Sequence, residues 1–191
     1  MLSGPFAAIS SRRLLPWLLS LALCVVGGLT SPARAQPAQA GLDLRDTLAG
    51  ILAYTRWPVE PDPLRLCVMG QSPHADNLLQ RGLATAGPRP VTVRRPQPDI
   101  AMATQCDAVY VATLDADSWR ALLADLTGRS VLTLCERSEL CTAGGMVRLQ
   151  VDSSEHQVRF EVNLDAVARS TVRIHPLVLK LGRRSASGEP R

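Results

Sequence analysis

The sequence contains no CxxC pair, and its only histidines, His74, His156 and His175, are far apart along the chain. Structural zinc sites need closely spaced cysteine or histidine ligands, and thiol oxidoreductases need a CxxC motif at the start of a helix. The sequence therefore argues against both a metal centre and a thiol oxidoreductase. We expect a protein without a metal or any other cofactor.

Phosphate-binding and catalytic motifs are also missing. Gly70 follows a predicted strand and precedes a predicted helix, where α/β proteins often bind phosphate, but residues 70–74 (GQSPH) fit neither GxGxxG nor GxxxxGK. Ser72, His74 and Asp76 lie at the start of one predicted helix, where such close neighbours rarely face each other as a nucleophile and its base must. We therefore expect a protein that is not an enzyme.

No apolar run is long enough to cross a membrane. Two arginines precede the longest one, residues 14–29, which is shorter than the roughly 20 apolar residues of a transmembrane helix. Residues 33–35 (ARA) then provide the small-x-small pattern that signal peptidase accepts. We therefore predict that residues 1–35 are a signal peptide, cleaved near Ala35 and Gln36, and that the mature protein is periplasmic.

Removal of this segment changes the charge balance. It takes away three of the 21 basic residues and none of the 17 acidic ones, so the net charge falls from +4 to +1. Nucleic-acid binding needs a clustered basic surface, and we expect no nucleic-acid partner. The remaining length suits one hydrophobic core, which predicts a single domain over residues 36–182 and a polar, disordered tail over residues 183–191.

Four cysteines remain in the mature chain: Cys67, Cys106, Cys135 and Cys141. An even number of cysteines in an oxidising compartment predicts two disulfides. Four cysteines allow three pairings, and the sequence alone does not choose among them. Pairing the neighbours, Cys67 with Cys106 and Cys135 with Cys141, is the simplest.

Strand and helix patterns alternate over most of the mature chain. Asp43, Ser72, Asp115 and Asn163 each precede an apolar helical pattern and are suited to cap it. The second of these helices carries Leu83 on its inward stripe and is expected to end at Gly87-Pro88. Short apolar runs between the helices predict buried strands, at residues 64–69, 91–94, 108–112 and 131–134. This order predicts an α/β fold with three layers, a mostly parallel sheet flanked by helices.

The pattern changes towards the C-terminus. Residues 146–151 and 158–162 alternate apolar with polar side chains, which predicts an antiparallel hairpin at the edge of the sheet. Arg159 and Glu161 lie on the polar face of the hairpin, where they are candidates for binding a partner or are simply solvated. Pro176 is expected to start a last helix that carries Leu177, Leu179 and Leu181.

A second group of residues suggests a ligand site. Arg56-Trp57 follows the first predicted helix, and Arg173 and His175 precede the last one. Arginine beside an aromatic ring can hold a carboxylate or phosphate while the ring stacks on a planar group. If Arg56, Trp57, Arg173 and His175 converge, they form a cationic pocket for a small anionic or aromatic metabolite.

Several of these segments together resemble the YfiR-like family of bacterial periplasmic proteins. The resemblance runs from about Leu44 to Leu181 and depends on the order and spacing of its parts rather than on one motif. These parts are residues 54–58 (YTRWP), residues 66–70 (LCVMG), Cys106, the Cys135/Cys141 pair, Gly145-Met146 and residues 159–164 (RFEVNL).

The resemblance implies a function. Members of that family are dimeric, non-enzymatic repressors that bind the periplasmic region of a YfiN-type inner-membrane diguanylate cyclase and so lower cyclic di-GMP and biofilm formation. It also implies a second partner, a YfiB-type outer-membrane lipoprotein that sequesters the repressor. The alternative is an accessory protein that binds a small molecule for another membrane signalling system.

Overall fold

The computed structural model describes residues 43–83, 85–98, 100–136, 138–152 and 157–182. The chain divides into the units Met1–Pro37 and Ala38–Arg191, and all of the described residues belong to the second unit. The predicted signal peptide and C-terminal tail lie outside these residues and stay predictions, as does the single-domain boundary at residue 36. Within the described residues, no helix is both long and apolar enough to cross a membrane.

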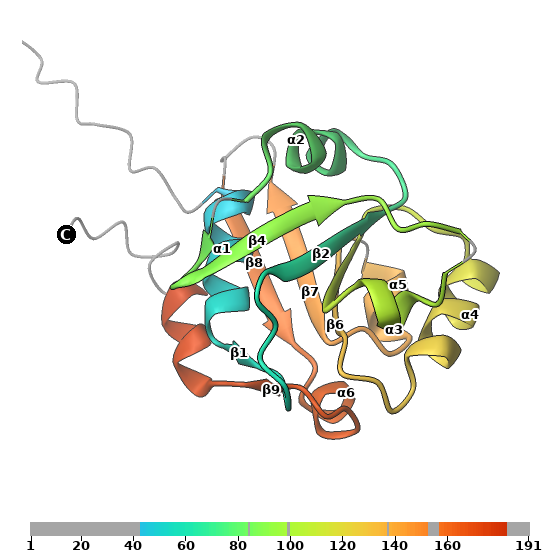
Figure 1. Cartoon of the computed structure of the whole chain (residues 1–191). Coiled ribbons are helices and arrows are strands. Elements are labelled where there is room, and N and C mark those ends of the chain that lie inside the picture. Colours follow the sequence, from blue (N-terminus) through green and yellow to red (C-terminus); the bar gives the residue numbers. More distant parts are fainter. Residues whose placement is uncertain (1–42, 84, 99, 137, 153–156, 183–191) are drawn as a thin grey trace, which may run out of the picture. The chain divides into compact units, whose positions relative to one another are not determined.

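A seven-stranded mixed sheet forms the centre of the described unit, in the order β3-β4-β2-β5-β6-β7-β8 (Figure 1). The pairs from β4 to β7 are parallel, whereas β3 and β8 run antiparallel at the two edges. The predicted α/β class is confirmed. The strands are β2 (Leu64–Met69), β3 (Thr85–Ala86), β4 (Arg89–Arg94), β5 (Ala108–Val111), β6 (Leu132–Cys135), β7 (Val147–Asp152) and β8 (Gln157–Val162).

Four helices begin where the sequence predicts, each after a side chain that accepts a hydrogen bond from a backbone N–H of the first turn. The capping residues are Asp43, Ser72, Asp115 and Asn163. These bonds satisfy N–H groups that have no partner within the helix. The four helices are α1 (Leu44–Ala53), α2 (Pro73–Arg81), α4 (Ala116–Leu126) and α6 (Leu164–Ala168), and the shorter ones are α3 (Met102–Gln105), α5 (Ser138–Thr142) and the 3₁₀ helix η1 (Pro176–Val178).

Helix α2 is shorter than predicted. It ends at Arg81 because Gly82, with φ of 62°, leaves the helical conformation. Leu83 is therefore outside the helix, although it is still buried in the core. The following residues form the short hairpin β3–β4, which the sequence analysis did not predict, and its turn contains Gly87, with φ of 64°.

The sheet buries both faces, because alternate residues of each central strand enter different clusters. In β5, Ala108 and Tyr110 belong to the larger cluster, which includes the buried residues of α1 and α2. Val109 and Val111 belong to the second cluster, which includes those of α4 and α5. Helix α1 contacts both edge strands, β3 and β8, so the sheet curls around this helix (Figure 1).

A two-stranded ribbon lies outside the main sheet. It pairs β1 (Thr55–Arg56), directly after α1, with β9 (Arg173–Ile174), directly before η1. The last predicted helix is present: Pro176 starts it as the 3₁₀ turn η1, and residues 179–182 continue it as α-helix. Of its three leucines, Leu177 and Leu179 are exposed and Leu181 is buried.

Candidate functional site

The ribbon brings together three of the four residues of the predicted ligand site. Arg56 and Arg173 are direct cross-strand partners, and the backbone N–H of His175 donates to the carbonyl of Tyr54 at 2.9 Å. The rings of Tyr54 and His175 are stacked, with centroids 6.4 Å apart. Because two arginines are paired, the ribbon carries a concentrated positive charge. Like charges directly opposite each other destabilise an antiparallel pair.

Both arginines of the ribbon are held by backbone carbonyls. One terminal nitrogen of Arg56 donates to Ala53 and Thr55, and one terminal nitrogen of Arg173 donates to Ser170 and Val172. None of these bonds neutralises the guanidinium charge, because the acceptors are uncharged. The terminal nitrogens can still bind an anion through their remaining N–H groups.

Trp57, the fourth residue of the predicted site, is only 5% exposed and packs into the core. Its indole N–H donates to the carbonyl of Asp107 at 3.0 Å, and the guanidinium of Arg89 lies 5.1 Å from the ring centroid. One interaction holds Trp57 against the start of β5, and the other covers the ring with a cation. The ring therefore has a structural role in addition to any contact with a ligand.

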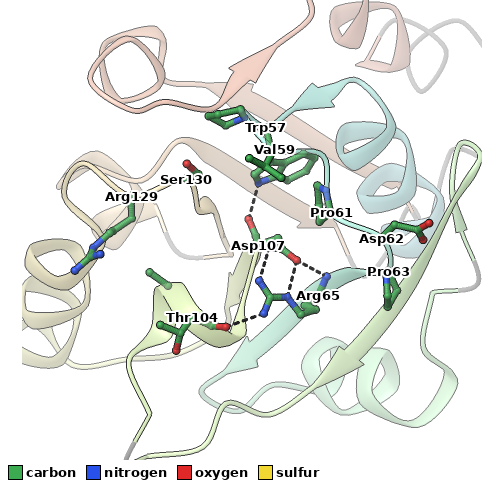
Figure 2. A pocket seen from close by; sticks show the side chains of 12 residues that line it. Trp57, Val59, Pro61, Asp62, Pro63, Arg65, Thr104, Asp107, Arg129 and Ser130 are labelled. Atoms are coloured by element: carbon green, nitrogen blue, oxygen red, sulfur yellow. Dashed lines mark hydrogen bonds and ion pairs between the residues drawn. The ribbon is translucent and has the colours of Figure 1, made fainter.

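Asp107 is the centre of a network that the sequence analysis missed (Figure 2). Its carboxylate accepts hydrogen bonds from the backbone N–H, Nε and Nη2 of Arg65, at 2.9, 2.9 and 2.7 Å. The hydrogen bond from Arg65 to Asp107 is the main cause that raises the pKa of the guanidinium above its ordinary value, against a smaller lowering by burial. No sequence pattern identified this pair, since the two residues are joined only by the parallel pairing of β2 and β5.

A cavity of about 600 Å³ lies beside this network. Its wall includes Trp57 and the proline-rich segment 58–63, with Arg65 and Asp107 at its base and Thr104, Arg129 and Ser130 on the opposite side (Figure 2). It lies at the amino-terminal ends of β2, β5 and β6. Ligand sites of open parallel sheets usually lie at the carboxyl ends, so the fold class did not point to it.

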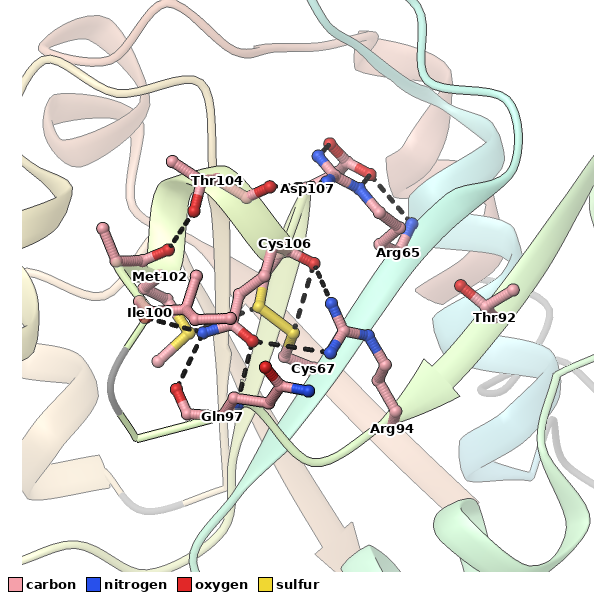
Figure 3. Close-up of a disulfide and its surroundings, with 12 residues drawn as sticks. Arg65, Cys67, Thr92, Arg94, Gln97, Ile100, Met102, Thr104, Cys106 and Asp107 are labelled. Carbon is pink, nitrogen blue, oxygen red and sulfur yellow. Dashed lines mark hydrogen bonds and ion pairs between the residues drawn. A yellow bond between two sulfur atoms is a disulfide. The ribbon is translucent and has the colours of Figure 1, made fainter.

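The structure contains two disulfides, Cys67–Cys106 and Cys135–Cys141, which is the simplest of the three possible pairings. The first ties the middle of β2 to the residue before Asp107 (Figure 3). Next to it, the buried side-chain amide of Gln105 accepts a hydrogen bond from the backbone N–H of Gln97. The same amide donates to the carbonyls of Gln97 and Ile100. This disulfide therefore fixes the base of the long connection between β4 and β5.

The second disulfide fixes the turn that leads into β7. A side chain at Gly145 would place its Cβ 2.8 Å from the sulfur of Cys135 and 3.1 Å from the Cα of Cys141. Glycine is thus required there by the close approach of the disulfide. A small cavity of about 140 Å³ lies between this turn and the charged pair Arg148 and Glu161.

The outer face of the β7–β8 hairpin carries the two predicted partner-binding residues. Val158 is buried and Phe160 packs against the core, while Arg159 and Glu161 are exposed. Arg148 lies directly opposite Glu161 and forms an ion pair with it, and the side-chain amide of Gln150 donates to Glu161 at 3.2 Å. This polar row is continuous with the turn that the Cys135–Cys141 disulfide fixes.

Near the carboxyl ends of the parallel strands, Glu136 accepts hydrogen bonds from the hydroxyls of Tyr110 and Ser72. Tyr110 is completely buried, and this burial, together with the negative charge of Glu136 and the hydrogen bond to it, raises the pKa of its hydroxyl strongly. Tyr110 is therefore a neutral donor that holds Glu136 in place. Ser72, which follows β2, also caps α2. The cluster therefore joins the end of β2 to Tyr110 in β5 and to Glu136 directly after β6.

Comparison with known protein families gives a match over most of the chain. The model of a family described as YfiR/HmsC-like matches residues 45–183. The matched range contains the ribbon, both disulfides, the Arg65–Asp107 network and the hairpin. It begins and ends within two residues of the range over which the sequence itself resembles that family.

Proposed function

The chain belongs to the YfiR/HmsC-like family, and from this premise we propose that it is a periplasmic repressor of a YfiN-type inner-membrane diguanylate cyclase. By binding the periplasmic region of the cyclase, it lowers cyclic di-GMP and biofilm formation. The single observation that carries this proposal is the family match over residues 45–183. Membership also supports a regulatory, non-catalytic role.

The two disulfides support the proposed location. Disulfides form and persist in oxidising compartments such as the bacterial periplasm. All four cysteines are almost completely buried, so the bonds contribute to the stability of the fold. We propose that residues 1–35 direct export and are removed near Ala35 and Gln36, and that residues 36–182 form one domain.

The outer face of the hairpin is the proposed contact with the cyclase. Its row combines the exposed residues Gln150, Arg159 and Glu161 with the half-buried Arg148 in a defined charge pattern, which suits electrostatic recognition. Repression requires that this face binds the inactive state of the cyclase more tightly than the active state, because equal affinities shift no equilibrium. A preference of about 100-fold corresponds to about 2.7 kcal/mol.

The role as repressor is tested by deleting the gene and measuring cyclic di-GMP in strains with and without the cyclase. We expect cyclic di-GMP and surface attachment to rise only where the cyclase is present. Unchanged cyclic di-GMP in a strain that expresses the cyclase contradicts the proposal. N-terminal sequencing of periplasmic material tests export, and a chain that starts at Met1 contradicts the cleavage site.

The hairpin contact is tested by charge changes that leave the fold intact. The variant E161R replaces the ion pair with Arg148 by two like charges directly opposite each other, which costs roughly 1–2 kcal/mol. The double variant R148E/E161R restores an ion pair but reverses the pattern. If the cyclase recognises the charges, neither variant is captured on the periplasmic region of the cyclase, whereas R120E on α4 is captured normally. Capture of R148E/E161R at the wild-type level rejects this contact.

Two further partners complete the proposal. We propose that a YfiB-type outer-membrane lipoprotein sequesters the repressor and so releases the cyclase, and that the repressor is a homodimer. Sedimentation of the purified mature protein tests the second point, and a monomer at all concentrations contradicts it. Addition of the lipoprotein to a preformed complex with the cyclase tests the first, and the expected result is release of the cyclase.

The ribbon favours a second candidate function, an accessory sensor for a small anionic or aromatic metabolite. Its support is the cross-strand pairing of Arg56 with Arg173, next to His175 and Trp57. An anion bound between the two arginines relieves their repulsion and stabilises the folded state by about 2.7 kcal/mol at 100 times its Kd. Thermal unfolding with inorganic phosphate and phenyl phosphate tests this. Equal stabilisation of wild type and the variant R56Q/R173Q contradicts the site.

A further inference from the structure

The cavity beside Asp107 has a fixed polar base. The three hydrogen bonds from Arg65 satisfy the carboxylate of Asp107, whose side chain is only 12% exposed. The carbonyl of Asp107 holds the indole of Trp57 at 3.0 Å and also accepts the backbone N–H of Leu132 at 3.0 Å. Asp107 thus joins the cavity wall to β2 and β6.

Arg65 presents unused donors to this cavity. A guanidinium has five N–H groups. Three of them bind Asp107 and the carbonyl of Thr104, and the other two make no hydrogen bond within the described part of the chain. The side chain is 37% exposed, so these donors are accessible, and the carboxylate of Asp107 holds the guanidinium in a fixed orientation.

Arg129 adds a second positive charge to the cavity. The charge of Arg65 is matched by Asp107, whereas the side chain of Arg129 forms no ion pair among the described residues and is exposed. In Figure 2 it lines the opposite side of the cavity and extends away from Arg65, so it can turn inward without breaking a bond. The carboxylate of Asp62, in contrast, points away from Arg65 on the other side (Figure 2).

The remaining wall is stiff and mainly apolar. It consists of the Trp57 ring, Val59 and three prolines, with Asp62 as its one charged residue. Val59 is 85% exposed at the rim, so a ligand that covers it removes apolar surface from water. The volume of about 600 Å³ lies within the range of 300–1,000 Å³ that is typical of small-molecule sites.

We propose that this cavity binds a small organic acid, with its carboxylate at Arg65 and Arg129 and its apolar body against Trp57 and Val59. This site uses other arginines than the Arg56–Arg173 ribbon, although Trp57 belongs to both candidate sites. It is also independent of the proposed contact with the cyclase, because the hairpin face contributes no residue to it.

The indole N–H of Trp57 provides a local test, because its resonance reports directly on the wall of the cavity. The ¹H–¹⁵N spectrum of the protein without residues 1–35 contains two indole signals, from Trp57 and Trp119, and the variant W119F assigns them. Benzoate and hexanoate are titrated at constant pH and ionic strength, with benzamide and hexanamide as neutral analogues of the same shape. We expect the acids to shift the Trp57 signal with at least tenfold higher affinity than the amides.

Variants separate the two arginines from general charge effects. R129A is expected to weaken benzoate binding at least threefold without changing thermal stability, because Arg129 is exposed and makes no ion pair in the described structure. R65K keeps the charge but loses the planar fork, and it is expected to weaken binding further. R120A, an exposed arginine of α4 outside the cavity, is the matched control and should bind like wild type.

Three results would overturn the proposal. Equal affinity for acids and amides means that the cavity does not select an anion. Wild-type affinity in R129A removes one of the two proposed anchors. A shift of the Trp119 signal alone, or no shift of the Trp57 signal at millimolar acid, places binding elsewhere or excludes it.

Discussion

The two disulfides are expected to contribute unequally to stability, because they close loops of very different length. Cys67 and Cys106 are 39 positions apart, whereas Cys135 and Cys141 are 6 positions apart. In the chain-entropy description, the longer loop stabilises the folded state by about 4 kcal/mol and the shorter one by about 2.4 kcal/mol. Removing the first bond should therefore cost about 1.5 kcal/mol more than removing the second.

The comparison between the variants C67A/C106A and C135A/C141A isolates this effect. All four cysteines are less than 5% exposed, so each variant loses similar packing contacts and the difference reflects the cross-link. Urea unfolding of the variants without residues 1–35, followed by the fluorescence of Trp57 and Trp119, gives the free energy of unfolding of each. A reduced wild type should be at least as unstable as C67A/C106A.

The outcome that refutes this reasoning is a loss in C135A/C141A equal to or larger than that in C67A/C106A. It would mean that the unfolded chain is not a flexible coil over residues 67–106, or that the folded turn before β7 depends on its cross-link. The close contact of Gly145 with Cys135 makes the second explanation testable. If it holds, the hairpin amides of C135A/C141A exchange faster with solvent while those of β2 do not.

Three further predictions concern single side chains. D107A should lower the free energy of unfolding by about 2–3 kcal/mol in urea, less than the loss of a fully buried pair because Arg65 is 37% exposed; an unchanged value contradicts the role of Asp107 as a network centre. Tyr110 ionises more readily in the unfolded chain, since the folded state raises its pKa, so stability should fall above pH 10 by about 1.4 kcal/mol per pH unit more than in Y110F. Parallel pH profiles of wild type and Y110F would show that the hydroxyl does not ionise on unfolding. The pKa of Asp115 is lowered, chiefly by its hydrogen bonds to Ser118, so its contribution is present above the ordinary value of 3.8 and is lost as the pH falls through the folded value. The difference in stability between wild type and D115A should accordingly shrink in acid, and a constant difference would assign the loss to packing.

The order of elements followed from local chemistry that the sequence displays directly. Asp43, Ser72, Asp115 and Asn163 cap the helices that the apolar spacing predicts, because a cap acts on backbone groups only two or three residues away. The alternation over residues 158–162 likewise decided which side of the hairpin is buried. These interactions depend on neighbours along the chain, so a pattern read along the chain can find them.

The candidate sites depend on contacts between distant segments. The sequence placed Trp57 with Arg56, Arg173 and His175, but only the fold decided that the indole turns to Asp107 while the two arginines face each other across the ribbon. Arg65 and Asp107 carried no sequence signal, since 42 residues separate them and a single charged residue at a strand end is common. The cysteine count predicted two disulfides, yet the choice among three pairings required the positions of β2, β5 and β6.

The sequence alone determined the class of fold, the caps and the family resemblance, because these arise from short-range pattern and composition. The tertiary structure decided which charges meet, because side chains from strands far apart in the chain become neighbours only when the sheet pairs them.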